Sequence, residues 1–177
     1  FESGAILQYL ARKTGQFYGK TERDRVAVDQ WLMWQMGGFG PMPGQAHHFL
    51  KYAPALDPPN DLPYAKDRYR REVARLYGVL DKQLATNRYA AGDFLSIADM
   101  AIWPWAMSWQ GQEQTLDDKP NFARWLKEPK SQVFRLFGYA GTGKTTLARH
   151  FAEEVDGDVL FAAFTGKAAQ VLRSGPR

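Results

Sequence analysis

Apolar side chains recur at three- and four-residue spacing over the first 126 residues of this 177-residue chain. That period is typical of helices that bury one face, and no alternating strand pattern interrupts it. Helices are predicted over residues 4–12, from Thr21 to Gln35, over 64–84 and over 97–109. This part of the chain is therefore expected to form a bundle of helices rather than a sheet.

Glycines and prolines divide these predicted helices. The stretch 37–44 contains four glycines and two prolines. A kink or loop is expected there, with helix resuming over 45–52, because proline lacks a backbone donor and clashes with the preceding turn. Four prolines between 53 and 63 predict a surface loop. Ser96 and Asp99 have the spacing of a helix-start capping box, whose removal should cost about 1 kcal/mol.

The pattern changes after Pro129. Two short apolar runs, 133–137 and 159–164, predict buried strands, and a helical pattern separates them. Strand, helix and strand in this order are the opening of a parallel α/β sheet. The predicted fold class is mostly α, with a helical bundle over residues 1–128 and a truncated α/β P-loop segment over residues 129–177.

The strongest chemical motif is G-x-x-x-x-G-K-T, from Gly138 to Thr145. Its glycines allow backbone N–H groups to face phosphate oxygens, and the following helix directs its positive end at the same anion. Lys144 is expected to reach the β- and γ-phosphates of ATP, and the Thr145 hydroxyl to bind Mg²⁺. The alternative without a binding function is a glycine turn with a solvated lysine. The predicted nucleotide-binding residues are Gly138, Ala140, Gly141, Thr142, Gly143, Lys144, Thr145 and Thr146.

Phosphate binding alone does not predict ATP hydrolysis. Hydrolysis also needs an acidic side chain at the end of a later strand to hold Mg²⁺. Asp156 and Asp158 instead lie in a turn before their strand. No catalytic residue is therefore predicted.

Residues 134–146 and 161–169 resemble the start of the motor in RecD-like superfamily-1 DNA helicases. The resemblance extends over 131–174. It implies that Thr165 and Lys167 contact the backbone of single-stranded DNA. An ordinary helix start with an exposed lysine is the alternative for these two residues.

Residues 1–126 resemble the C-terminal helical domain of nu-class, or Ure2-like, glutathione transferases. The resemblance implies that Glu2 pairs with the α-ammonium of glutathione and that Ser3 binds its α-carboxylate. The alternative is that both residues merely start a helix. A dimer formed through the helical domain is also expected. The matching motifs lie at 2–11, 31–35, 37–42, 45–49 and 96–105.

Several other features have structural explanations. His47 and His48 are adjacent and face different directions on a helix, so packing or surface roles are favoured over metal binding. Core packing is favoured over ligand stacking for the tryptophans at positions 31, 34, 103 and 105. A solvated helix face is favoured over DNA binding for the arginines between 68 and 75.

Composition sets the remaining limits. The absence of cysteine excludes disulfides, thiolate metal sites and cysteine nucleophiles from these residues. The net charge of +4 is a mild basic bias, compatible with an anionic ligand. No apolar run is long enough for a membrane span, so no membrane partner and a cytoplasmic location are expected. The opening at Phe1 suggests a fragment.

Three functions are compatible with these features. The leading hypothesis is a composite fragment, in which a truncated transferase-like domain is joined to the ATP-binding P-loop of a helicase without a complete active site. The alternatives are an ATP-binding module of a DNA helicase and a glutathione-binding, transferase-like protein.

Overall fold

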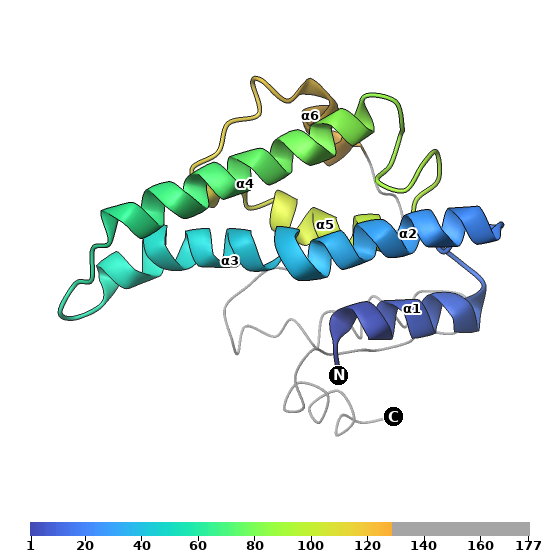
Figure 1. Ribbon diagram of the computed structural model, residues 1–177, viewed down its shortest axis with the longest axis horizontal. Helices are drawn as coiled ribbons and strands as arrows, with labels where there is room; N and C mark the ends of the chain where they lie inside the picture. Colours follow the sequence, from blue (N-terminus) through green and yellow to red (C-terminus); the bar gives the residue numbers. More distant parts are fainter. Residues whose placement is uncertain (129–177) are drawn as a thin grey trace, which may run out of the picture. The chain divides into compact units, whose positions relative to one another are not determined.

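The computed structural model describes residues 1–128, which form a bundle of helices (Figure 1). Within these residues no strand is present beyond one isolated bridge between Tyr89 and Gly92. The mostly helical prediction is confirmed for this part. The α-helices are α1 (Ser3–Thr14), α2 (Glu22–Trp34), α3 (Pro41–His47), α4 (Pro63–Leu84), α5 (Ile97–Ala106) and α6 (Pro120–Lys127). Two π-helical segments, η1 (Gln35–Phe39) and η2 (His48–Tyr52), and two 3₁₀ turns, η3 (Ala53–Ala55) and η4 (Trp109–Gln112), lie between them.

Helix α2 begins where the sequence predicts, immediately after Thr21. The Thr21 hydroxyl accepts a hydrogen bond from the backbone of Asp24 at 3.1 Å. In return the Asp24 carboxylate accepts from the backbone N–H groups of Thr21 at 2.9 Å and of Lys20 at 3.0 Å. These bonds favour the charged carboxylate and lower the pKa of Asp24. A reciprocal cap therefore fixes the start of this helix.

The glycine- and proline-rich stretch 37–44, where a kink or loop was expected, contains a π-turn followed by the start of α3, so the regular α-helix is interrupted there without forming a loop. The backbone N–H of Gly40 donates to the carbonyl of Gln35 at 2.8 Å, which is the five-residue step of a π-turn. Helix α3 then starts at Pro41, four residues earlier than expected. Proline is tolerated in the first turn of a helix because its missing N–H has no intrahelical partner there.

Helix α5 packs against α2, η1 and α1. It is shorter than predicted and ends at Ala106. One face of α4 is buried through Val73, Leu76, Tyr77 and Leu80. From it, the ring of Tyr77 stacks on Phe39 at 5.5 Å and on Phe122 at 4.5 Å between ring centroids. Stacked aromatic rings thus join η1, α4 and α6 through the core.

The start of α5 is held by the buried carboxylate of Asp99. Ser96 and Asp99 form the predicted capping box, and Asp99 accepts from the Ser96 N–H at 3.1 Å and from its hydroxyl at 2.9 Å. Asp99 also accepts from the backbone of Ala90 and from the indole N–H of Trp125, both at 2.9 Å. The same carboxylate therefore connects α5 to the preceding loop and to α6.

Helix α6 is attached to α4 at both ends. The Asp81 carboxylate on α4 accepts from the backbone N–H groups of Asn121 and Phe122 at 2.9 Å each. At the other end, the Arg124 guanidinium donates to the carbonyls of Leu84 at 2.8 Å and Asn87 at 3.2 Å. Helix α4 thus supplies partners for the free backbone groups of α6, and α6 covers the end of α4.

Candidate functional site

Glu2 and Ser3 lie at the open N-terminus of α1. Glu2 is the residue before the helix, is exposed, and has a φ of 67°, which is uncommon for a residue with a side chain. No side chain caps this end, and the first turn contains no acidic residue. The first backbone N–H groups of a helix have no intrahelical acceptor and carry partial positive charge. This end can therefore receive an anion.

The first turn of α1 packs against Met36 of η1. The Ser3 hydroxyl donates to the Met36 sulfur at 3.6 Å. Gly4 is buried, and a Cβ added to it would lie 3.2 Å from Met36 Cγ. A side chain at position 4 would require the Met36 side chain to shift by a few tenths of an ångström. Glycine thus lets the first turn of α1 approach the bundle closely.

Asp29 on α2 fixes the orientation of α1. Its carboxylate accepts from the side-chain amide of Gln8 at 2.7 Å. It also accepts from the Tyr18 hydroxyl at 2.7 and 2.9 Å. Burial, followed by the bond to Asp29, raises the pKa of the Tyr18 hydroxyl. Sequence reasoning missed these three residues, because they belong to no motif and meet only once the two helices pack.

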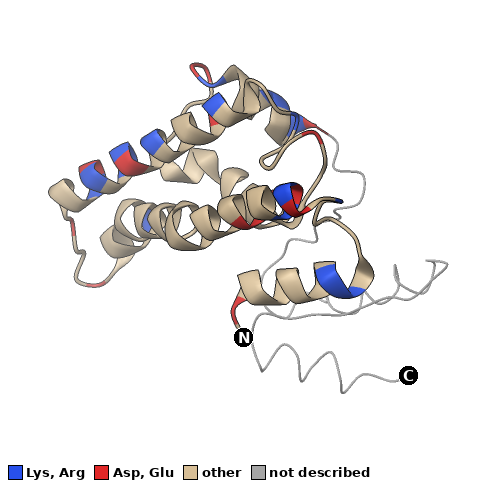
Figure 2. Ribbon diagram, turned by 45° about the vertical axis from the view of Figure 1, so that its right-hand side comes forward, with Lys and Arg blue, Asp and Glu red and all other residues tan. Residues whose placement is uncertain are grey.

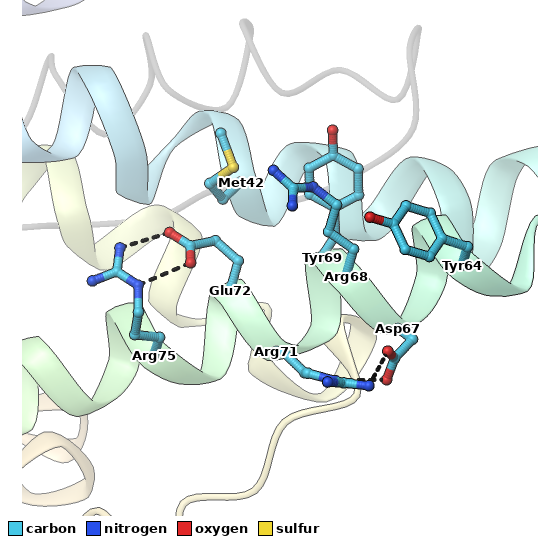
Figure 3. A pocket seen from close by; sticks show the side chains of 8 residues that line it. All are labelled: Met42, Tyr64, Asp67, Arg68, Tyr69, Arg71, Glu72 and Arg75. Carbon is cyan, nitrogen blue, oxygen red and sulfur yellow. Dashed lines mark hydrogen bonds and ion pairs between the residues drawn. The ribbon is translucent and has the colours of Figure 1, made fainter.

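A second feature is a groove of about 730 Å³ along the first half of α4, next to α3 (Figure 3). Its volume lies in the range of small-molecule sites. In Figure 3 the side chains of Tyr64, Arg68 and Tyr69 extend on one side of α4, whereas those of Asp67 and Arg71 extend on another. The lining residues are Met42, Tyr64, Asp67, Arg68, Tyr69, Arg71, Glu72 and Arg75.

Two of the three arginines in this groove have carboxylate partners. Arg71 is paired with Asp67 one turn earlier, with one N–H···O distance of 3.0 Å. Arg75 donates two hydrogen bonds to Glu72, at 2.8 and 2.6 Å. Arg68 makes no hydrogen bond or ion pair within residues 1–128.

Most other cations of α4 are also matched by acidic side chains. Arg70 is paired with Glu113, and Lys66 with Asp61 at 2.6 Å. Figure 2 shows the resulting alternation of basic and acidic residues along the helix. A continuous basic surface is therefore absent from the described face of α4, in agreement with a solvated helix rather than a DNA-binding one.

The histidines and tryptophans have structural surroundings. The His47 imidazole is half-buried against Ser108, and burial lowers its pKa, as does the nearby Lys51. Within residues 1–128 no group of three or more His, Asp or Glu side chains could hold a metal ion. The four tryptophans considered above pack in or against the core.

The residues predicted to bind nucleotide, Mg²⁺ and DNA lie outside the part of the chain that the structure describes. The P-loop residues Gly138, Ala140, Gly141, Thr142, Gly143, Lys144, Thr145 and Thr146 all lie outside the described residues, and so do Thr165 and Lys167. Of the predicted binding residues, the structure therefore places only Glu2 and Ser3.

Comparisons with known proteins agree with the helical fold. Residues 45–132 match the family "Glutathione S-transferase, C-terminal domain". The chain is 43% identical to the disulfide-bond oxidoreductase YfcG of Escherichia coli, over 87% of this chain and 66% of YfcG.

Solved structures of glutathione transferases are similar as well. One is the enzyme of Burkholderia graminis with two glutathione molecules bound per subunit, with a TM-score of 0.63 and 40% identity, covering 71% of this chain and 53% of that one. Another is Ure2p in complex with glutathione, with a TM-score of 0.63 and 30% identity, covering 72% and 60%.

Residues 1–128 thus form a glutathione-transferase-like helical domain. Its relatives include YfcG and Ure2p, which agrees with the Ure2-like branch suggested by the sequence motifs. These findings support the glutathione-binding alternative better than a composite of transferase and helicase. The chain spans 66% of YfcG and about half of the Burkholderia graminis protein. None of the helices within residues 1–128 has the length and apolar character needed to cross a membrane.

Proposed function

We propose that this chain binds glutathione at the N-terminus of α1, as part of a glutathione-transferase-like protein. The observation that carries the proposal is the uncapped first turn of α1, which presents Glu2 and Ser3 together. Glutathione-bound relatives with the same helical fold support it.

The γ-glutamyl end of glutathione has the charges that this helix end can bind. Its α-carboxylate would accept hydrogen bonds from the Ser3 hydroxyl and from free backbone N–H groups of the first turn, where the helix dipole favours negative charge. Its α-ammonium would pair with the exposed Glu2 carboxylate. Rotation of the Ser3 hydroxyl away from Met36 makes it available to the ligand at small cost, because sulfur is a weak acceptor.

In a reaction that needs a thiol, the reacting thiol would be that of the bound glutathione. The 177 residues contain no cysteine, so none of them supplies a thiolate. YfcG is named a disulfide-bond oxidoreductase. We therefore propose glutathione-dependent thiol chemistry, with thiol–disulfide exchange as the first reaction to assay.

Thermal unfolding in the presence of glutathione tests the binding site. Millimolar glutathione is expected to raise the Tm of the full chain, because a ligand that binds only the folded state stabilises it. Glu2→Ala should remove that shift. Glu22→Ala is the matched control, since Glu22 is also an exposed glutamate near a helix start and forms only a 3.6 Å pair with Arg25. Equal shifts in wild type and Glu2→Ala would refute the site.

ATP binding at residues 138–146 is a second candidate function, favoured by the complete G-x-x-x-x-G-K-T spacing. It would belong to a separate segment beginning near residue 129. Calorimetric titration with Mg-ATP should give saturable binding that Lys144→Ala abolishes. The same titration giving no heat, or the same affinity in both proteins, would leave the motif as a glycine turn with a solvated lysine.

A further inference from the structure

Arg12 and Arg25 line one pocket of about 230 Å³ between the end of α1 and the start of α2. Arg12 lies in the last turn of α1, where Figure 2 shows the basic residues of that helix. Arg25 lies in the first turn of α2. The Arg12 guanidinium makes no hydrogen bond or ion pair within residues 1–128, and Arg25 has only a 3.6 Å pair with Glu22. Two guanidinium groups with little compensation therefore share one pocket.

The other carboxylates near this pocket are already occupied. Asp29 accepts the Tyr18 hydroxyl at 2.7 and 2.9 Å, and Asp24 accepts backbone N–H groups at the start of α2. The Glu22 side chain is 83% exposed, so water screens its attraction to the neighbouring arginine. Burial and Asp29 raise the pKa of the Tyr18 hydroxyl, whereas the charge of Arg12 opposes this rise. The Arg12 charge therefore acts at the Tyr18 wall of the pocket.

The pocket has the size of a small anion. Sites for small molecules usually measure about 300–1,000 Å³, and one water molecule takes about 30 Å³. The smaller volume of about 230 Å³ holds a tetrahedral oxyanion with a few waters. Gly15 and Gly19 line it without side chains, and a Cβ added to Gly15 would meet no atom within 4 Å. The backbone thus leaves the space beside the two arginines open.

We propose that Arg12 and Arg25 form a binding site for a phosphoryl group, carried by inorganic phosphate or by a phosphate monoester. Such a group has a second pKa of about 6 and carries close to two negative charges at neutral pH, which matches two guanidinium groups. Each guanidinium can donate two parallel hydrogen bonds to phosphate oxygens. The site goes beyond the proposed binding of glutathione, because it uses neither Glu2 nor Ser3.

Calorimetric titration of the full chain with inorganic phosphate, in a phosphate-free buffer at a pH of about 8, tests the site. Phosphate is expected to bind about tenfold or more tightly than dimethyl phosphate, which has the same tetrahedral centre and one negative charge. Arg12→Gln and Arg25→Gln should each weaken phosphate binding about tenfold, which corresponds to about 1.4 kcal/mol. Arg25→Lys should give an intermediate affinity, because an ammonium keeps the charge and loses the planar fork. Glu22→Gln should strengthen binding by up to about fivefold, because it frees Arg25.

A parallel titration with glycerol 3-phosphate separates the two sources of the phosphoryl group. An affinity no higher than that of inorganic phosphate assigns the site to inorganic phosphate. Tighter binding of glycerol 3-phosphate, weakened in the same way by Arg12→Gln, assigns it to a monoester.

Three control variants separate this pocket from other anion sites. Arg23→Gln removes an exposed charge of α2 that does not line the pocket, so phosphate affinity should stay within about twofold of wild type. Glu2→Ala and Lys144→Ala should also leave it unchanged, because they alter the glutathione site and the P-loop. Equal phosphate affinity in wild type, Arg12→Gln and Arg25→Gln would overturn the proposal. An equal loss in Arg23→Gln would do the same by indicating a diffuse basic surface, as would loss of binding in Lys144→Ala or equal affinity for phosphate and dimethyl phosphate.

Discussion

At the scale of single residues, the Asp99 carboxylate performs two tasks. It caps α5 through Ser96, and it binds the backbone of Ala90 and the indole of Trp125. The S-x-x-D spacing predicted the first task, because capping is a local interaction. The second could not be foreseen, because Trp125 lies 26 residues away and reaches Asp99 only after α6 has packed. We therefore expect the loss of the Asp99 carboxylate to cost more than the roughly 1 kcal/mol of the cap alone.

Asp99→Asn is expected to lower the free energy of unfolding by about 2–4 kcal/mol, because the amide cannot accept from every donor around the buried site. Urea denaturation measures this loss. Asp93→Asn is the matched control: Asp93 is exposed and accepts one bond from the backbone of Arg88 at 3.1 Å, so its loss should be about 1 kcal/mol or less. Similar losses in the two variants would show that the buried bonds contribute little.

At the scale of elements, the π-turn η1 explains why two prolines fit a nearly continuous helical path. The sequence indicated a break at 37–44, and the break is real, but it takes the form of one extra residue in a turn. Proline and glycine content shows that regular α-helix cannot continue. It does not show whether the chain leaves the helical path or widens it, because that choice depends on packing around Gln35 and Trp105.

Gly40→Ala tests the tight packing of this turn. An added Cβ would lie 2.8 Å from the side-chain amide nitrogen of Gln35 and 3.2 Å from its backbone carbonyl oxygen. The free energy of unfolding is therefore expected to fall by about 1–3 kcal/mol. Gly37→Ala, in the same π-turn, meets nothing within 4 Å and should be neutral or stabilising by up to about 1 kcal/mol. Thermal unfolding of both variants measures the difference, and equal Tm values would contradict the packing described for Gln35.

At the scale of the whole molecule, protonation of His47 links unfolding of the bundle to pH. Burial, then the charge of Lys51, lowers the pKa of His47 in the folded state. As pH falls, His47 therefore takes up a proton at a higher pH in the unfolded chain, where its pKa is about 6.5, than in the folded chain. The stability that depends on a neutral His47 is fully present above the unfolded-state pKa. It is lost as pH falls from there through the lowered pKa of the folded state.

His47→Gln should flatten the dependence of unfolding free energy on pH between about 7.5 and 5.5, because glutamine at position 47 does not titrate. Urea denaturation at a series of pH values gives this slope. His48→Gln provides the control, since it replaces the neighbouring, exposed imidazole. A wild-type slope in His47→Gln would mean that other groups cause the dependence.

Helix periodicity predicted a helical bundle, including α4 and the start of α2 at Thr21, but it predicted neither α6 nor the helical path through 37–44. The candidate binding residues Glu2 and Ser3 came from a resemblance, because two adjacent polar residues have no pattern of their own. The Asp29 network depends on which side chains meet across elements, which spacing along one helix does not reveal.

The attachment of α6 to α4 has a consequence for the order in which the chain folds. Asp81 supplies the cap for a helix that begins about forty residues later, and an eight-residue helix is too short to persist alone in water. Helix α4, with 22 residues, needs no such help to begin forming. We therefore expect α6 to become helical only once α4 is in place, so that the end of the described chain closes over a bundle already assembled.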